Sequence, residues 1–171
     1  MKVTLQTERL TLRPWRIEDA PEMFQTWAKD PEVTKYLTWN YHENEEQTKQ
    51  VIEAWLKQYE KPERINFAIT LKNGTLIGGI DVVGYIDKVP VIGYNLGVKY
   101  WNKGYMTEAC KAVLNYLKGL GYSKVRIDAM ENNVASIRVI EKCGGVFQNK
   151  EMEELPNKKR VVIVNRYIVF L

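Results

Sequence analysis

A short polar turn around one glycine runs directly into an amphipathic helix at Trp101–Tyr122. The N–H groups in the first turn of a helix have no intrahelical partner, and together with the helix dipole they attract anions. Gly104 has no Cβ, so the backbone can approach a bulky anion there, and Lys103 adds a positive charge. The sequence contains neither G-x-x-x-x-G-K-[ST] nor G-x-G-x-x-G. The turn by itself fits a phosphate site and an ordinary loop into a helix equally well.

A second candidate for chemistry follows the next expected strand, at Asn133–Gly145. Asn133 is a natural N-cap and Gly144 a natural helix stop, so a well-capped helix explains most of this segment. That explanation leaves out Ser136, which falls in the first turn at the same sheet edge as the glycine turn. Ligands of α/β sheets gather at the carboxyl ends of parallel strands. A capping role and a catalytic role for Ser136 therefore both stay open.

The elements that must position these turns follow from hydrophobic periodicity and from turn residues. We expect strands at residues 3–5, 10–13, 65–71, 76–86, 91–98, 124–130 and 160–170. We expect short helices after Asp19 and Asp30, and longer ones at 43–60, 105–120 and 134–143. Asn73-Gly74 suits a tight type I′ turn between two of the strands. The order indicates one mixed α/β domain whose parallel crossover lies around the glycine turn.

The composition limits the classes of protein. A chain of 171 residues suits a single domain over residues 1–171, and its net charge of +4 comes without a basic run long enough for a nucleic-acid arm. No apolar run reaches the length of a membrane span, and residues 1–15 lack an apolar signal core. The spacing of Cys110 and Cys143, with one histidine, argues against a metal site. We expect a cytoplasmic protein that binds neither nucleic acid nor membrane.

Taken together, the motifs resemble those of the GNAT acetyltransferases, which move an acetyl group from acetyl-CoA to an amine. The cofactor loop of that family reads Gln/Arg-x-x-Gly-x-Gly/Ala. Here it is Trp101–Met106, in which the central glycine matches and both flanking consensus positions differ. One branch, the ribosomal-protein N-terminal alanine acetyltransferases and their relatives, is similar over nearly the whole chain. Its motifs are matched by Thr7–Pro14, Ile92-Gly93-Tyr94, Thr107-Glu108-Ala109, Asn133–Ser136 and Lys142-Cys143-Gly144, with Gly145 in place of the family's Phe.

The resemblance implies the GNAT fold, a single twisted mixed sheet of about seven strands with flanking helices, and acetyl-CoA as co-substrate with no metal. The strand before the loop would splay from its neighbour, and its backbone at Leu96, Gly97 and Val98 would pair with the pantetheine arm. Asn133 would bind the pantetheine, and Lys142 would lie near the nucleotide end. The pyrophosphate would be bound by N–H groups of Lys103, Gly104, Tyr105, Met106, Thr107 and Glu108.

The resemblance also sets an expectation for catalysis. Many members protonate the leaving thiolate with a tyrosine whose position is Ile140 here, so Ser136 is expected to be the general acid, with the N–H of Val98 as oxyanion donor. The base stays open among Asp81, Asp128, Glu131, His42 and a tyrosine-linked water. A weak base favours an acceptor amine of low pKa, such as a protein N-terminus or a small molecule.

The acceptor pocket is expected to come from Trp39–His42, with Tyr85 as a further candidate. These aromatics could pack a flat substrate or fill the join between helices and sheet. Two alternatives to an enzyme stay open: a catalytically silent CoA-binding sensor and a scaffold without cofactor. The sequence also leaves open whether the protein forms a homodimer.

Overall fold

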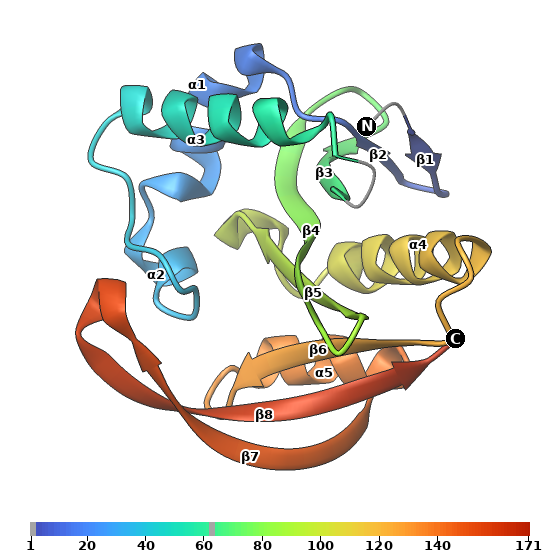
Figure 1. Ribbon diagram of the computed structural model, residues 1–171. Coiled ribbons are helices and arrows are strands. Elements are labelled where there is room, and N and C mark those ends of the chain that lie inside the picture. The colour runs from blue at the N-terminus through green and yellow to red at the C-terminus, as the bar shows by residue number, and fades with distance from the viewer. Residues whose placement is uncertain (1–2, 62–63) are drawn as a thin grey trace.

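The computed structural model describes residues 3–61 and 64–171, so Met1 and Lys2 of the N-terminal segment lie outside it. One open sheet of eight strands runs through the molecule in the order β1-β2-β3-β4-β5-β6-β8-β7 (Figure 1). All neighbouring strands are antiparallel except β5 and β6, which are parallel. The strands are β1 Leu5–Gln6, β2 Leu10–Arg13, β3 Asn66–Leu71, β4 Leu76–Ile86, β5 Val89–Leu96, β6 Lys124–Met130, β7 Val146–Leu155 and β8 Arg160–Phe170. The predicted mixed sheet is confirmed, with eight strands instead of about seven.

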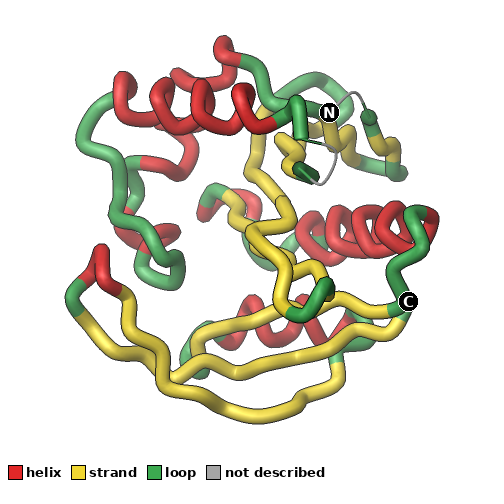
Figure 2. Tube along the Cα trace, viewed as in Figure 1, coloured by secondary structure: helices red, strands yellow, loops and turns green. Residues whose placement is uncertain are grey.

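Helices cover the sheet from both sides (Figure 2). The α-helices are α1 Ala20–Met23, α2 Pro31–Thr34, α3 Glu45–Gln58, α4 Tyr105–Gly119 and α5 Val134–Lys142. A π-helical turn, Phe24–Ala28, continues α1, and short 3-10 turns lie at Ile17–Asp19, Val98–Tyr100 and Pro156–Lys158. The expected short helix after Asp30 begins at Pro31, and Asp30 caps it by accepting from the N–H of Glu32. None of the described helices is long and apolar enough to cross a bilayer.

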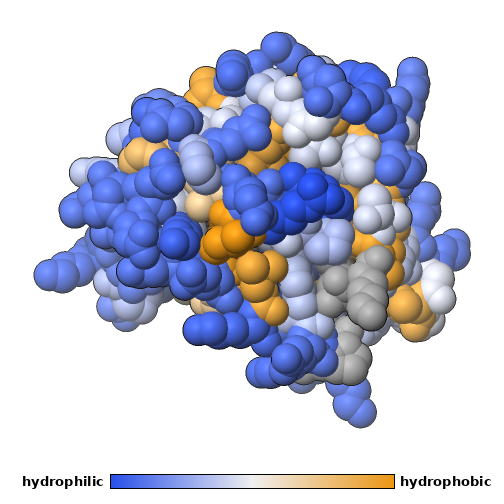
Figure 3. Space-filling model, turned by 90° about the horizontal axis from the view of Figure 1, so that it is seen from above, coloured by the Kyte–Doolittle hydropathy of each residue, from blue (hydrophilic) through white to orange (hydrophobic). Residues whose placement is uncertain are grey.

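The central strands are buried on both faces because helices cover both. On β3, Phe67 and Ile69 belong to the core beneath α4, whereas Ala68 belongs to the cluster beneath α1 and α3. This alternation follows from the two-residue period of a strand. Ile52 of α3 closes the second cluster, and the outer surface above it is mostly polar (Figure 3). The two faces of the sheet are therefore separate environments.

Strand β7 was not expected from the sequence. It lies at the edge of the sheet, pairs only with β8, and nearly all of its side chains are exposed. Periodicity predicts a strand only when one face is buried, so the polar run QNKEMEE gave no signal. The neighbouring strand β8, which does alternate at its C-terminal half, was predicted with its correct bounds.

The predicted type I′ turn at Asn73-Gly74 is wrong. Such a turn needs positive φ at both central residues, and in this turn Gly74 is at φ 91° while Asn73 is not positive. The type I′ pattern occurs in the next hairpin, where Asp87 and Lys88 have φ of 50° and 65° between β4 and β5. Asn-Gly was the stronger sequence signal, but the chain makes a longer loop there.

Two further boundaries differ from the sequence analysis. Strand β5 ends at Leu96, and Val98 belongs to a 3-10 turn instead of the strand. The helix expected at 105–120 ends at Gly119, so Leu120 follows α4 and is 52% exposed. Both residues lie where an element ends, the point at which a periodic pattern gives the least information.

The two parallel strands diverge beyond their first contacts. β5 and β6 pair at Val91 with Arg126 and at Ile92 with Ile127, and no further pairs follow. The carboxyl-terminal half of β5 therefore stands apart from β6, as the resemblance predicts. Helix α4 starts from the end of β5, and α5 starts from the end of β6, so both helix N-termini face this opening (Figure 1).

Candidate functional site

The N-terminus of α4 has the geometry of an anion site. Gly104 precedes the helix with φ of 80°, a left-handed conformation that favours glycine. The first intrahelical bond runs from the N–H of Glu108 to the carbonyl of Gly104, at 3.0 Å. The N–H groups of Tyr105, Met106 and Thr107 therefore point out of the helix end, available to a ligand. The prediction that the N–H of Glu108 binds the pyrophosphate is therefore wrong, because this N–H is already bonded within the helix.

The side chain of Glu108 instead fastens the N-terminal segment to α4. Its carboxylate accepts from the Thr7 hydroxyl at 2.6 Å, the Arg9 N–H at 2.8 Å and the Arg9 Nε at 2.7 Å. Burial raises the pKa of Glu108, but the hydrogen bonds from Thr7 and Arg9 outweigh it and lower that pKa below its usual value. Glu108 is thus held ionised as a structural anchor.

That anchor places a second positive charge beside the glycine turn. Arg9 donates from Nη1 to the carbonyl of Lys103 at 2.9 Å, and its guanidinium lies 4.6 Å from the ring centroid of Tyr105. A Cβ on Gly104 would meet Arg9 Nη2 at 3.3 Å. Arg9 was known from the sequence only as part of a motif, and its position at the turn was missed. We name the notch formed by Gly104, the N–H groups of Tyr105–Thr107 and Arg9 the anion notch.

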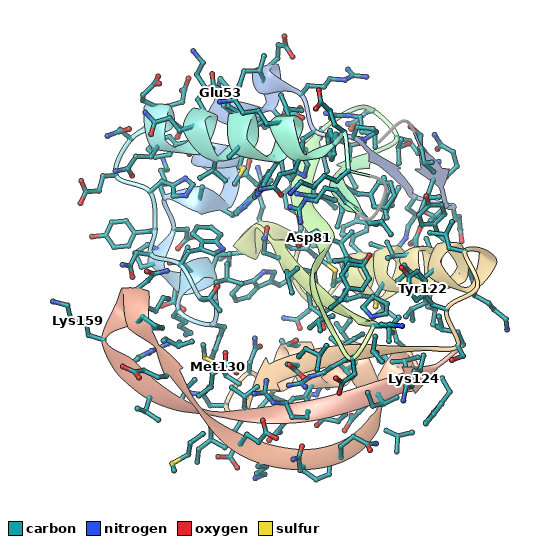
Figure 4. All side chains as sticks on the ribbon, viewed as in Figure 1. Glu53, Asp81, Tyr122, Lys124, Met130 and Lys159 are labelled. Atoms are coloured by element: carbon teal, nitrogen blue, oxygen red, sulfur yellow. The ribbon has the colours of Figure 1, made fainter. Side chains whose placement is uncertain are left out.

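Replacing Arg9 by Gln should weaken CoA binding by about five- to tenfold, because one fixed cation beside the notch is lost. Calorimetric titration of CoA measures the effect. Lys124→Gln is the control, since it removes one charge from the exposed start of β6 (Figure 4). Equal CoA affinity in the two variants would contradict a role for Arg9 at the notch.

The residue at the first consensus position of the loop has a role of its own. Trp101 donates from its indole Nε1 to the carbonyl of Leu96 at 2.8 Å, which fixes the loop against the end of β5. The neighbouring Gly97 donates its N–H to Ile77 at 3.0 Å, and a Cβ there would meet the carbonyl of Thr26 at 2.8 Å. Gly97 is therefore required by close packing, and its N–H is not free for a ligand. The N–H of Val98 has no partner within the described residues.

Ser136 faces the opening from the first turn of α5. Asn133 caps this helix by accepting from the backbone N–H of Ser136 at 3.2 Å, so the Ser136 hydroxyl is not needed as a cap. That hydroxyl instead lies 2.9 Å from the hydroxyl of Tyr94 on β5. Ile140, at the family's tyrosine position, is fully buried. Tyr94 thus brings a phenol to Ser136 from the opposite wall.

Tyr94 lies in the motif Ile92-Gly93-Tyr94, whose residue types alone gave it no expected role at the site. Burial raises the pKa of Tyr94 far above its usual value, so the phenol stays protonated. It also lies 3.3 Å from the Ser136 carbonyl oxygen. A neutral phenol in this place can donate to Ser136 or accept from it.

The end of α5 comes back to the start of α4. Cys143, which follows Lys142, has its Sγ 3.9 Å from the carbonyl oxygen of Thr107. Lys142 is exposed and directly precedes Cys143 in the chain, so its proposed place near the nucleotide end of the cofactor stays a prediction. The structure therefore brings together the loop, the end of β5 and both ends of α5, all from one side of the sheet.

Most of the candidate bases are occupied by other contacts. Asp128 is bound by Arg126 at 2.9 Å and by Arg166 at 2.7 Å, and Glu131 pairs with Lys150 at the surface. His42 Nδ1 lies 2.7 Å from the Thr48 hydroxyl, and burial lowers the pKa of His42. Its ring packs 5.1 Å from Trp39, which is part of the join between helices and sheet. Asp81 is the remaining carboxylate.

The β7–β8 turn reaches across to the α2 region. Asn40 donates to the carbonyl of Asn157 at 2.8 Å, and Lys158 donates to the carbonyl of Thr34. These bonds hold the outer end of the β7–β8 arm against the segment after α2, on the side of the molecule away from the C-terminus (Figure 1). The segment Trp39–His42 is therefore partly covered by this arm.

The chain matches the model of the acetyltransferase (GNAT) domain over residues 9–146. It is a GNAT acetyltransferase. An uncharacterized N-acetyltransferase p20 from Bacillus licheniformis is 31% identical over 98% of this chain and 95% of its own. Among solved structures, the fold is similar to a RimL ribosomal L7/L12 alpha-N-protein acetyltransferase in complex with coenzyme A, with a TM-score of 0.87 and 19% identity over 99% of this chain and 98% of that one.

A second solved neighbour of this GNAT acetyltransferase is the microcin C7 self immunity acetyltransferase MccE in complex with acetyl-CoA and AMP. It has a TM-score of 0.85 and 18% identity, over 96% of this chain and 94% of that one. At these identities the two structures show the shared fold alone. The first of these two structures contains coenzyme A, and the second contains acetyl-CoA and AMP.

Proposed function

We propose that this GNAT acetyltransferase transfers an acetyl group directly from acetyl-CoA to a primary amine, with an α-amine as the preferred acceptor. The observation that carries the proposal is the anion notch at the mouth of the β5–β6 opening. The diphosphate of CoA binds at the notch, and the pantetheine follows the separated half of β5 past Asn133. The thioester then lies near Ser136 and Tyr94.

Catalysis in this arrangement comes from placement and from two polar contacts. The site holds the amine against the thioester carbonyl, which removes most of the entropic barrier. The N–H of Val98, for which the described part of the chain offers no partner, stabilises the developing oxyanion. Ser136 gives its proton to the leaving thiolate, and its contact with Tyr94 holds the hydroxyl in position.

The acceptor follows from the pKa of amines. At pH 7 an α-amine with a pKa of about 7.7 is roughly 15–20% neutral, whereas a lysine with a pKa of about 10.4 is less than about 0.1% neutral. Of the candidate bases, Asp81 is the carboxylate without a close ion pair among the described residues, and it is largely buried. Such a site gains most from an amine that loses its proton easily. One structural neighbour is described as modifying the N-terminal serine of ribosomal protein L7/L12, which supports an α-amine without deciding between protein and small molecule.

A matched pair of peptides tests this proposal. One peptide has a free N-terminus and no lysine, and the other has an acetylated N-terminus and one lysine. We expect kcat/KM at pH 7 to be about 100-fold or more higher for the free N-terminus, because of its neutral fraction. Release of the CoA thiol is the measurement. Faster reaction of the lysine peptide would overturn the α-amine preference, and no thiol release with any amine would favour a CoA-binding sensor.

A further inference from the structure

A buried polar cluster lies on the face of the sheet opposite Ser136. Tyr94 points toward α4 and α5, so its strand neighbours Gly93 and Asn95 point to the other face, toward α1 and α3. Asp81 on β4 is directly opposite Gly93, and Asn66 on β3 is directly opposite Asp81. We name Asn66, Asp81 and Asn95 the acid–amide row. It crosses three strands and ends at the separated half of β5.

The acid–amide row has polar atoms without partners. Within the described residues, Nδ2 of Asn66 and Oδ1 of Asn95 are buried and make no hydrogen bond. Asn66 is only 2% exposed, and its Oδ1 accepts from the indole of Trp15 at 2.8 Å, which leaves the amide nitrogen turned away from that bond. A buried polar group without a hydrogen-bond partner costs free energy, and a bound ligand that supplies the partner would remove that cost.

The carboxylate of Asp81 is only weakly paired. Its one ion pair among residues 3–61 and 64–171, to Nη2 of Arg64, is long at 3.4 Å. Arg64 also donates to the carbonyl of Val82. Burial raises the pKa of Asp81 to about 6, although Arg64 opposes the shift. The titratable groups that interact with Asp81 are Arg64 and, from the end of α3, Tyr59. Asp128, by contrast, has two close arginines.

Asp81 is nevertheless reachable. Its side chain is 23% exposed, and the residue opposite it is Gly93, which has no side chain to cover it. A Cβ on Gly93 would meet Val83 Cγ1 at 2.7 Å, so packing keeps this position small. Figure 4 shows Asp81 on β4 near the centre of the view, beneath α3. The opening between β5 and β6 begins one residue beyond Ile92, next to Gly93.

We propose that Asp81 receives the ammonium of the acceptor and takes its proton, and that the amide of Asn95 binds the acceptor next to the reacting amine. The inference rests on the proposed function, because it assigns the acceptor side of the same site. Acid and base then lie on opposite faces of β5, with Ser136 and Tyr94 on one face and Asp81 on the other. A peptide N-terminus fits, since its ammonium meets the carboxylate and its first peptide N–H can donate to Oδ1 of Asn95.

The proton balance is complete with the groups present. Asp81 takes one proton from the ammonium, and the neutral nitrogen forms a bond to the acetyl carbon. The C–S bond breaks as the tetrahedral intermediate collapses, and the thiolate takes a proton from Ser136. Ser136 regains its proton from the second N–H of the acceptor nitrogen. The products are the amide, CoA thiol, and one proton that Asp81 returns to solvent.

The test is the pH dependence of kcat/KM for a free-N-terminal peptide, compared between the wild type and Asp81→Asn. For the wild type we expect a bell-shaped plot of kcat/KM against pH. The rate constant rises near pH 6 as Asp81 ionises, and it falls near the amine pKa of about 7.7 as the ammonium is lost. For Asp81→Asn we expect activity at pH 7 to fall by about 100-fold and to rise with pH through the amine pKa, since only neutral amine then reacts. A purely structural role would lower activity equally at every pH.

Three further variants keep the result interpretable. Glu53→Gln removes a carboxylate from the exposed surface of α3 and should retain the bell (Figure 4). Asp81→Glu keeps a carboxylate and should retain a bell with lower amplitude, even if Asp81→Asn folds poorly. The inference would be overturned if Asp81→Asn kept the pH profile of the wild type. It would also be overturned if the rise of kcat/KM near pH 6 disappeared in Asp128→Asn instead.

A binding measurement separates this inference from the proposed function. With CoA bound and no acetyl group, we expect the wild type to bind the free-N-terminal peptide about tenfold more tightly than its acetylated copy. Asp81→Asn should bind the two peptides equally. If the wild type fails to distinguish them, Asp81 is not the ammonium site, whether or not the protein transfers acetyl groups. If it distinguishes them but releases no thiol, the acceptor site stands and the proposed function fails.

Discussion

Gly104→Ala should lose at least about 100-fold in CoA affinity, which corresponds to about 2.7 kcal/mol. The left-handed φ of 80° costs a residue with a Cβ roughly 1–2 kcal/mol, so the turn would change shape. The added Cβ would also lie 3.3 Å from Arg9 Nη2 and would stand where the diphosphate must approach. Both effects act on the anion notch, and calorimetric titration of CoA measures their sum.

The chain offers a matched control in Gly121. Its φ of 91° is also left-handed, but a Cβ there would meet nothing within 4 Å, at the far end of α4. Gly121→Ala should therefore carry a similar backbone cost in a melting experiment while CoA affinity stays unchanged. Equal CoA affinities for the two alanine variants would show that the notch is not where the diphosphate binds.

Ser136→Ala is expected to lower kcat by about 100- to 1,000-fold without changing CoA affinity. The loss has the size of one general acid removed from the transition state. Helix α5 should be undisturbed, because its cap is Asn133 accepting from the backbone N–H of Ser136, which alanine retains. Steady-state kinetics with the free-N-terminal peptide, together with a melting curve, separates the two roles that the sequence left open.

Two other variants sharpen the result for Ser136. Tyr94→Phe removes the hydroxyl 2.9 Å from the Ser136 hydroxyl and should lower kcat by about tenfold, less than Ser136→Ala, because the serine proton is still present. Asn133→Ala should cost about 1 kcal/mol of stability as a lost cap. If Ser136→Ala lowers the melting temperature and leaves kcat unchanged, the serine is structural and another group protonates the thiolate.

The fold was predictable where hydrophobic periodicity carries the information. Helices α4 and α5 and strand β6 lie within one or two residues of their expected bounds, because each alternates apolar and polar residues at the right period. Strand β7 could not be predicted in this way, since its residues are polar on both sides at the edge of the sheet. Its pairing with β8 is a tertiary contact between two strands, which no local sequence pattern encodes.

The candidate site divides in the same way. The turn at Gly104 and the cap at Asn133 are local, so their residue types were enough to predict them. The contacts that shape the site join distant segments: Arg9 with the loop at Lys103, and Tyr94 with Ser136. Such pairs form only when the sheet is assembled. The sequence motifs that contain Arg9 and Tyr94 therefore did not predict their partners.

Asp81 shows why the base could not be chosen from the sequence. Asp81, Asp128 and Glu131 are equivalent acids when only residue types are known. Their environments differ, because arginines hold Asp128 and a lysine pairs with Glu131. Asp81 is largely buried, and its ion pair with Arg64 is long. Burial and pairing decide which carboxylate can accept a proton near neutral pH, and both are properties of the folded chain.

A crystal structure of the protein with CoA tests the central claim most directly. We expect diphosphate oxygens at about 2.7–3.2 Å from the backbone nitrogens that begin α4, with the pantetheine lying along the separated half of β5. The Gly104 turn should keep its left-handed conformation, and Arg9 should stay beside it. A bound CoA whose diphosphate lies away from this helix end, with the notch empty, would contradict the account.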